Sequence, residues 1–284
     1  MAEAKQDPSA TPRKTARMQH VLTVDSTQWL GPHLIRVVAG GPSLADFAHD
    51  GNTDAYVKLM FADPALGLEP PYDIAALRET LPAEQLPVTR TYTVRWFDAS
   101  AQKLAIDFVV HGDTGIAAPW AANAKPGDRF ALSGPGSGFK PDTEARWHVF
   151  VGDLSGLPAI SCAIESLPAE AEGVAHLEIT QTDDIIEIAN VSKVRVEWLL
   201  NPDASDAEFL ARCLQEGQWP QETNKGAGVQ VFAHGERESI KAVRRALAQR
   251  EVPREAISIS GYWARGRTED IFQAEKREPI GKID

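Results

Sequence analysis

Apolar residues in the first half of the chain come in short runs, often at every second position, and Gly, Pro or Asp residues separate the runs. This pattern is typical of β-strands joined by short connections. Closely spaced strands of this kind predict an antiparallel β-barrel. The predicted strands are two within residues 19–41, divided at Gly31-Pro32, and one each at 55–63, 90–98, 103–112 and 129–135.

Two stretches of this half lack the strand pattern. Residues 64–88 contain five prolines and little periodicity, so we expect a surface loop with one helical turn near 74–79. Residues 115–128 are predicted as a short helix that ends at Pro126-Gly127.

From about residue 146 strands alternate with helices, because apolar positions such as Leu157, Ile160 and Ile164 recur at helical spacing. Alternation of this kind predicts a parallel sheet with helices on both faces. The fold class is therefore a two-domain one, an antiparallel β-barrel followed by an α/β domain. We expect a disordered tail at 1–17, the barrel at 18–140, the α/β domain at 146–263 and a C-terminal tail at 264–284.

Charge and cysteine content narrow the class of protein. The net charge of −11 argues against nucleic-acid binding and means that an anionic ligand needs a local basic patch. No apolar run is long enough to span a membrane, and the N-terminal residues lack the apolar segment of a secretory signal, so we expect a cytoplasmic protein. Cys162 and Cys213 form no Cys-x-x-Cys motif, so no zinc or iron–sulfur site is expected.

The strand that begins "RTYT" carries polar residues where core residues would be usual. Alternation places Arg90 and Tyr92 on one face, and Thr91 and Thr93 on the other. A guanidinium group suits a pyrophosphate, and a phenol ring can stack on the planar ring of a flavin. The alternative is an exposed strand with a surface salt bridge.

The next strand leads into "HGDTGIAAPW", where Gly115 opens a helix-like segment. Free N–H groups at such a start can bind an anion. His111 is either a cofactor contact or a structural residue at the strand end. Trp120 either packs the helix on the barrel or contacts the cofactor.

Two basic segments follow in the second half. Gly235 precedes a helix carrying Arg237, Lys241, Arg244 and Arg245, which is either a solvated face or a site for the 2′-phosphate of NADPH. The last strand ends at Tyr262 and Trp263, which can cover a flavin or nicotinamide ring. The segment after it is rich in cations, which could instead pair with Glu269, Asp270 and Glu275; the cations are Arg265, Arg267, Lys276 and Arg277.

The motifs "RTYT", "HGDTG…W", "PGD", "SGPGSGF", "GD…LPA" and "GYWARGR" occur in this order over residues 18–277. In this the chain resembles the siderophore-interacting protein family, which consists of cytoplasmic FAD-dependent ferric-siderophore reductases related to ferredoxin reductases. The resemblance implies FAD and NADPH or NADH as cofactors, a ferric siderophore as substrate, and no metal held by the protein itself. No catalytic acid–base residues are required.

The resemblance also assigns residues. FAD would be bound by Arg90, Thr91, Tyr92, Thr93, Asp107, Val109, His111, Gly115, Ala117, Ala118 and Trp120. The nicotinamide nucleotide would meet Gly152, Asp153, Ser155, Gly235 and Arg237, with Tyr262 and Trp263 beside the rings. The siderophore would meet the four cations of the C-terminal segment.

Two departures from the family pattern matter. Ala118 stands where the family often has a phosphate-binding Ser, and "GDLSGLPA" places Leu154 and Ser155 where the family has Glu and Thr. The pose of the nicotinamide nucleotide therefore stays open. So do two other functions, a siderophore-binding protein without reductase activity and a flavin reductase with another electron acceptor. We expect a monomer, and a ferredoxin is an alternative electron donor.

Overall fold

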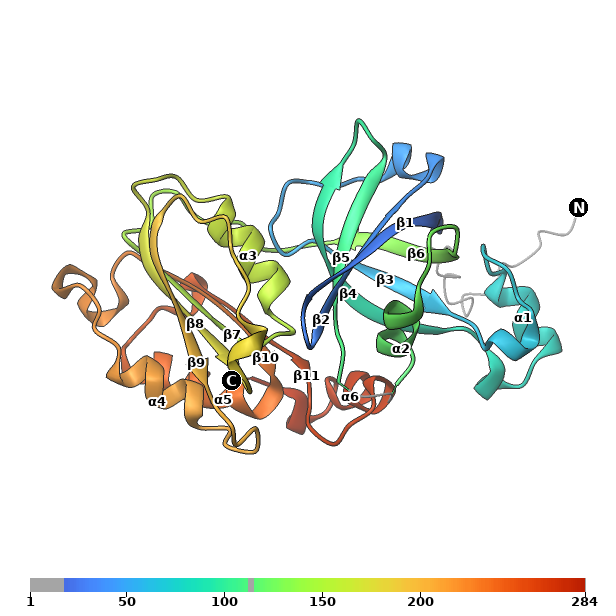
Figure 1. Ribbon diagram of the computed structural model, residues 1–284. Coiled ribbons are helices and arrows are strands. Elements are labelled where there is room, and N and C mark those ends of the chain that lie inside the picture. Colours follow the sequence, from blue (N-terminus) through green and yellow to red (C-terminus); the bar gives the residue numbers. More distant parts are fainter. Residues whose placement is uncertain (1–17, 112–114, 284) are drawn as a thin grey trace, which may run out of the picture.

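The computed structural model describes residues 18–111 and 115–283, which form a β-barrel and an α/β half side by side (Figure 1). Six antiparallel strands close the barrel in the order β1-β2-β5-β4-β3-β6, as the strand pattern predicted. Their bounds are β1 His20–Gly31, β2 Leu34–Gly40, β3 Tyr56–Phe61, β4 Val88–Asp98, β5 Lys103–Val109 and β6 Arg129–Gly136.

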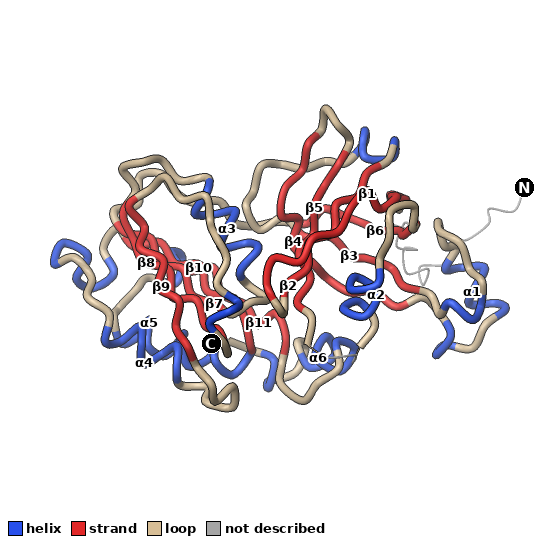
Figure 2. Tube along the Cα trace, viewed as in Figure 1, coloured by secondary structure: helices blue, strands red, loops and turns tan. Residues whose placement is uncertain are grey.

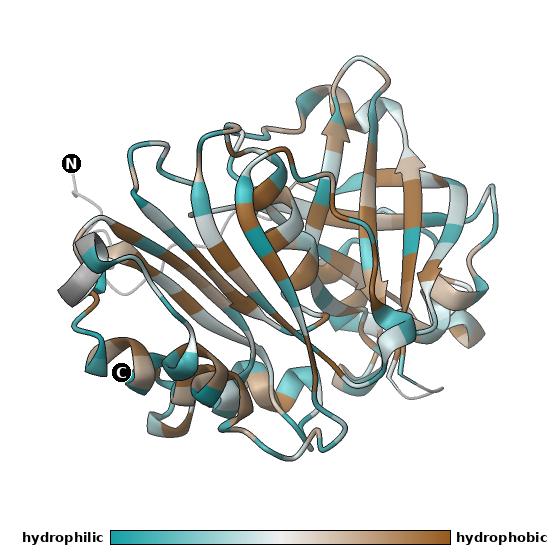
Figure 3. Ribbon diagram, turned by 60° about the vertical axis from the view of Figure 1, so that its left-hand side comes forward, coloured by the Kyte–Doolittle hydropathy of each residue, from teal (hydrophilic) through white to brown (hydrophobic). Residues whose placement is uncertain are grey.

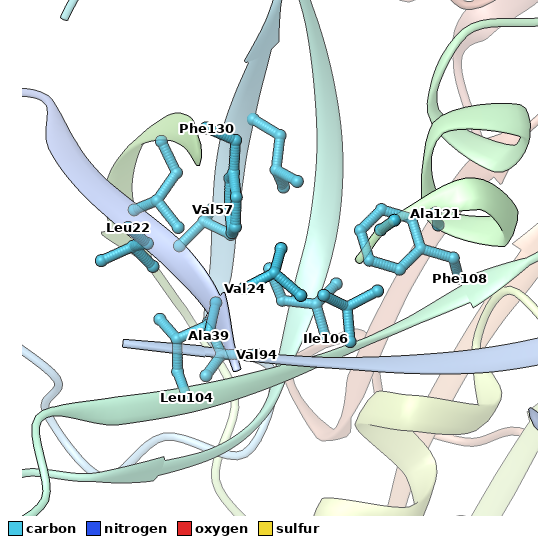
Figure 4. Packing of buried hydrophobic residues seen from close by; sticks show 14 of the residues in the cluster. Leu22, Val24, Ala39, Val57, Val94, Leu104, Ile106, Phe108, Ala121 and Phe130 are labelled. Carbon is cyan, nitrogen blue, oxygen red and sulfur yellow. The ribbon is translucent and has the colours of Figure 1, made fainter. Parts of the chain in front are cut away.

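Alternate residues of the strands fill the barrel with aliphatic and aromatic side chains. Val24, Val57, Val94 and Ile106 are each at most 2% exposed and meet in its interior (Figure 4). The short helix α2 (Ala117–Asn123) closes one end of this core. The Trp120 ring lies 5.1–5.8 Å from the rings of Phe61, Phe108 and Phe130, so Trp120 packs the helix on the barrel.

The second half is a five-stranded parallel sheet in the order β11-β10-β7-β8-β9, with helices on both faces (Figure 2). Helix α3 packs on the face toward the barrel, and α4 and α5 pack on the other face. Apolar residues concentrate along the middle of these strands (Figure 3). The bounds are β7 Trp147–Gly152, α3 Leu157–Glu165, β8 Glu172–Ile179, β9 Lys193–Leu200, α4 Phe209–Glu216, β10 Val229–Glu236, α5 Arg237–Gln249 and β11 Ile257–Trp263.

Two further helices lie outside these layers. Helix α1 (Ile74–Thr80) occupies the proline-rich loop at the place where a helical turn was expected. Helix α6 (Glu269–Glu275) lies in the segment predicted only as a C-terminal tail. Within the described residues, no helix combines the length and apolar character needed to cross a bilayer. The division into two domains at residues 140–146 stays a prediction.

A chain of buried charges joins the two halves. Asp107 on β5 is 3% exposed and accepts two hydrogen bonds from Arg36 on β2, at 2.6 and 2.7 Å. Its second oxygen lies 3.9 Å from Arg95 on β4, and Arg95 reaches across to Glu165 on α3 at 2.5 Å. On another side of the interface His33, between β1 and β2, lies 2.9 Å from the buried Asp184.

Asp107→Asn should lower the free energy of unfolding by about 3 kcal/mol, because it removes the only negative charge between two largely buried guanidinium groups. Urea denaturation measures the change. The matched control is Asp25→Asn, since Asp25 pairs with Lys103 at a site where both side chains are 42–50% exposed. That change should cost less than about 1 kcal/mol. Equal losses in the two variants would contradict a special role for Asp107.

Candidate functional site

Arg90 on β4 binds a carboxylate of helix α6. Its two terminal nitrogens donate to the two oxygens of Asp270 at 3.3 and 3.2 Å, and Nη1 also donates to the carbonyl of Thr89 at 2.8 Å. The Arg90 side chain is 15% exposed. The guanidinium group is thus presented as a two-pronged anion site, with a carboxylate of this chain in it.

Tyr92 follows Arg90 on the same face of β4, as the alternation predicted. Its ring lies 4.4 Å from the ring of Phe108 in the barrel core. Burial raises the pKa of the Tyr92 phenol, Glu269 of α6 raises it further, and Arg90 opposes this. Tyr92 therefore stays a neutral phenol next to both α6 and Arg90. Thr91 is exposed, whereas Thr93 is 7% exposed.

The segment after β5 is only partly described, since Gly112, Asp113 and Thr114 lie outside the described residues. His111 is exposed just beyond the strand, and Val109 packs partly buried beside α3. Gly115 has φ +86°, and no described atom lies within 4 Å of where its Cβ would be. Ala117 and Ala118 are buried at the start of α2, which no described side chain caps. This turn leaves room and backbone donors for a phosphate group.

Asp107, predicted as a cofactor contact, forms an ion pair inside the barrel. Both of its oxygens hold Arg36, with Arg95 beside them, so its carboxylate is not free for a ligand. This pairing could not be predicted from the sequence, because Arg36 lies on another strand 71 residues away.

In the α/β half, at the edge where the strands end, Asp153 accepts hydrogen bonds from several other residues. Its Oδ1 accepts from the Ser155 N–H at 2.8 Å and from the Ser155 hydroxyl at 2.5 Å. Its Oδ2 accepts from the Glu236 N–H at 2.9 Å and from the Trp263 indole at 2.8 Å. The residues predicted for the nicotinamide nucleotide thus do come together here, but their polar groups bind one another.

The glycines at this edge are required by close packing. A Cβ on Gly152 would lie 2.5 Å from the carbonyl oxygen of His234, and one on Gly156 would lie 2.3 Å from the same atom. On Gly235 it would meet the Asp153 carboxylate at 2.9 Å. These positions bring β7, the start of α3 and β10 into direct contact.

Tyr262 and Trp263 end β11 at the seam between the halves. The Tyr262 ring lies 4.8 Å from His234, and burial raises the pKa of its phenol, with Asp54, Tyr56 and Asp153 adding to the shift. Asp54 and Tyr56 belong to the barrel, so the Tyr262 ring sits between the halves. The Trp263 side chain is 37% exposed beside it.

The basic C-terminal segment is partly neutralised. Arg267 and the buried Arg237 both bind Glu275, at 2.7 and 2.5 Å, which is the tail salt bridge that the sequence offered as an alternative. Arg265 lies over the Trp263 ring at 5.8 Å, Lys276 lies over the Phe272 ring at 4.8 Å, and Arg277 is exposed. A cavity of about 220 Å³ lies between Arg237, Ser260, Phe272 and Lys276.

Three partners at the site were not predicted as site residues. Asp270 and Glu275 bind Arg90 and Arg237, and Glu236 caps α5 and accepts from the Arg265 N–H at 3.0 Å. Glu is not among the residues usually found at a helix N-cap, so the capping role of Glu236 was not recognisable from the sequence. The other two pairs join residues far apart in the chain. In the described part of the chain no three His, Cys, Asp or Glu side chains form a group suited to hold a metal ion.

Comparison with known proteins agrees with this architecture. The model of the siderophore-interacting FAD-binding domain matches residues 23–139, and that of the siderophore-interacting protein matches residues 145–266. The chain is 38% identical over 277 residues to Rv2895c of Mycobacterium tuberculosis, covering 92% of this chain and 96% of that protein. It is 32% identical over 251 residues to the ferric vibriobactin reductase ViuB of Vibrio cholerae, covering 88% and 90%.

Solved structures show the same relation. The siderophore-interacting protein SipS of Aeromonas hydrophila is 29% identical, with a TM-score of 0.76, over 94% of this chain and 99% of that one. The ferredoxin reductase of carbazole 1,9a-dioxygenase shares the fold at 17% identity and a TM-score of 0.61, over 86% of this chain and 69% of that one. A β-barrel joined to this parallel sheet, both matched in sequence, makes the chain a member of the siderophore-interacting protein family.

Proposed function

We propose that this protein is a ferric-siderophore reductase in which FAD, bound by the barrel, carries electrons from a nicotinamide nucleotide to Fe(III). The observation that carries the proposal is the pair formed by Arg90 and Tyr92. A guanidinium group in two-pronged contact with an anion lies beside a partly buried phenol ring, on one strand face at the seam between the halves.

The residues present fit FAD. Arg90 can exchange the Asp270 carboxylate for a pyrophosphate, because both offer paired oxygens to the guanidinium fork. The open turn at Gly115 and the uncapped start of α2 supply further donors. The missing hydroxyl at Ala118 removes one phosphate contact from this set. When bound, FAD accepts electrons in pairs and can release them singly, which suits a ferric acceptor.

The other residues of the site have two roles: aromatic side chains orient the cofactor rings, and cations attract the ferric siderophore. Tyr92 presents its ring from the barrel, and Tyr262 and Trp263 present theirs from the end of β11. Arg265, Lys276 and Arg277 offset the negative charge of the whole protein at this place, so that an anionic chelate can approach. The iron needs no ligand from the protein, since Fe(II) is held less tightly by hard oxygen ligands than Fe(III).

The reductase activity can be tested under anaerobic conditions. We expect a yellow protein that bleaches on addition of NADH or NADPH, regains its colour on addition of a ferric catecholate siderophore, and releases two Fe(II) per nucleotide to a ferrous chelator. A parallel sample reduced by dithionite and freed of excess reductant tests iron reduction without any nucleotide. A coloured protein that is reduced but releases no Fe(II) in either sample would contradict the proposal and favour another electron acceptor. Protein that binds the siderophore but never FAD would favour the binding-protein alternative.

Substitution of either partner of the Arg90–Asp270 pair should change FAD affinity, in opposite directions for the two residues. Arg90→Ala should weaken it by about 2–4 kcal/mol, because a paired phosphate contact is lost. Asp270→Asn should strengthen it by up to about tenfold, since the carboxylate that competes for Arg90 is removed. Quenching of flavin fluorescence measures both affinities.

The control is Glu278→Gln, which neutralises an exposed carboxylate of the same segment and should leave FAD affinity unchanged. Unaltered affinity in Arg90→Ala would refute the role proposed for Arg90. Weaker binding in Asp270→Asn would mean that Asp270 orients Arg90 for the cofactor instead of competing with it.

A further inference from the structure

In open parallel sheets ligands bind at the carboxyl ends of the strands, where the strand order reverses. Here β7, β8 and β9 follow one another to one side of the sheet and β10 and β11 lie to the other, so the reversal falls between β7 and β10. A nicotinamide nucleotide donor would therefore lie over Gly152 and His234. The charges around this point decide which nucleotide fits.

Of the two helices that start near this point, α5 is capped by a carboxylate of the chain, and the turn just before α3 also binds a carboxylate. Asp153 accepts from the N–H and hydroxyl of Ser155 ahead of α3, and Pro158 in the first turn has no N–H to offer. Glu236 accepts from the N–H groups of Glu238 and Ser239 at the start of α5, at 2.6 and 3.0 Å. The N–H groups at the start of α5, which could otherwise bind a phosphate, are thus in use, and so are those of Ser155 and Gly156 before α3.

Further carboxylates stand at the ends of the next two strands. Glu178 lies near the end of β8 and accepts from the Asn201 amide at 2.7 Å. Burial raises the pKa of Glu178, and Asp153 and Asp206 raise it further while Arg265 lowers it, so these groups lie close enough to interact. Asp203 and Asp206 follow β9.

Cations do not balance this edge. Among the described residues, the guanidinium group of Arg212 is bound to Asp206, and the charge of Arg265 lowers the pKa of Glu178 and of Asp203. Four carboxylates, those of Asp153, Glu178, Asp203 and Asp206, thus face two cations.

The cations of α5, which the sequence offered for a 2′-phosphate, are engaged elsewhere. Arg237 binds Glu238 and Glu275, Lys241 binds Glu238 and the carbonyl of Ile280, and Arg245 binds Glu208. Arg244 has a buried Nε without a partner in the described structure, on a helix that lies behind the sheet.

We infer that this edge selects NADH over NADPH, with Glu178 as the specificity-determining residue. An acidic side chain at the end of the second strand of such a sheet accepts a hydrogen bond from the ribose 2′-hydroxyl. The same carboxylate repels a 2′-phosphate, and Asp203 and Asp206 add to the repulsion. The selectivity rests on the proposed function for the presence of a nicotinamide donor, and it chooses between the two nucleotides that the sequence left open.

Binding of fragments tests this without any electron transfer. The FAD-loaded protein is titrated by calorimetry with ADP-ribose and with 2′-phospho-ADP-ribose, neither of which can reduce a flavin. We expect ADP-ribose to bind at least about tenfold more tightly in low salt. The preference should shrink in 0.5 M salt, because screening weakens repulsion of the phosphate. Glu178→Gln, which can keep the contact to Asn201, should reduce the ratio about fivefold or more, and Glu178→Gln with Asp203→Asn should reduce it further.

The control is Glu172→Gln at the opposite end of β8, where the carboxylate pairs with Lys193; it should leave the ratio unchanged. Equal or tighter binding of the 2′-phosphorylated fragment by the natural protein would overturn the inference. An affinity ratio that is the same in Glu178→Gln as in the natural protein would also overturn it. So would dissociation constants above about 1 mM for both fragments. None of these results affects iron reduction by the dithionite-treated protein, so failure of the inference is distinguishable from failure of the proposed function.

Discussion

The geometry of the site depends on the buried charge chain that joins β2, β5, β4 and α3. Arg95 holds Asp107 inside the barrel and Glu165 on the α/β half, and Cys162 on α3 donates its thiol hydrogen to the Arg95 carbonyl at 3.0 Å. This contact sits on the same strand as Arg90 and Tyr92. It thereby links the strand that carries both residues to helix α3 of the α/β half.

A second feature is that carboxylates of the chain accept hydrogen bonds from its own backbone N–H and guanidinium groups. Asp153 accepts from the Ser155 N–H in the turn before α3, Glu236 satisfies N–H groups at the start of α5, and Asp270 occupies the guanidinium group of Arg90. In a chain with a net charge of −11 such contacts make carboxylates part of the fold. An anion that bound the guanidinium group of Arg90 would therefore have to displace the Asp270 carboxylate.

Much of the fold was predictable, because strand alternation and helical periodicity are local properties. The six barrel strands and the alternating second half follow from them, and so does the common face of Arg90 and Tyr92. Pairings across the chain were not predictable. Nothing near Asp107 in the sequence indicates Arg36, and α6 gave a weak signal because it has only seven residues and a single buried one, Phe272. The roles of the site residues remain proposals for the same reason, since they depend on which charges meet in space.

The attachment of α6 has a consequence for how the protein responds to its surroundings. Glu275 satisfies Arg237 and Arg267 together, and Asp270 holds Arg90, while Phe272 alone supplies an apolar anchor. Solvent ions weaken the contacts that have an exposed partner, Arg90–Asp270 and Arg267–Glu275, more than the buried Arg237 contact, and leave the barrel and sheet cores almost unchanged. Ionic strength therefore acts as a physical control on how firmly α6 is attached to the rest of the protein.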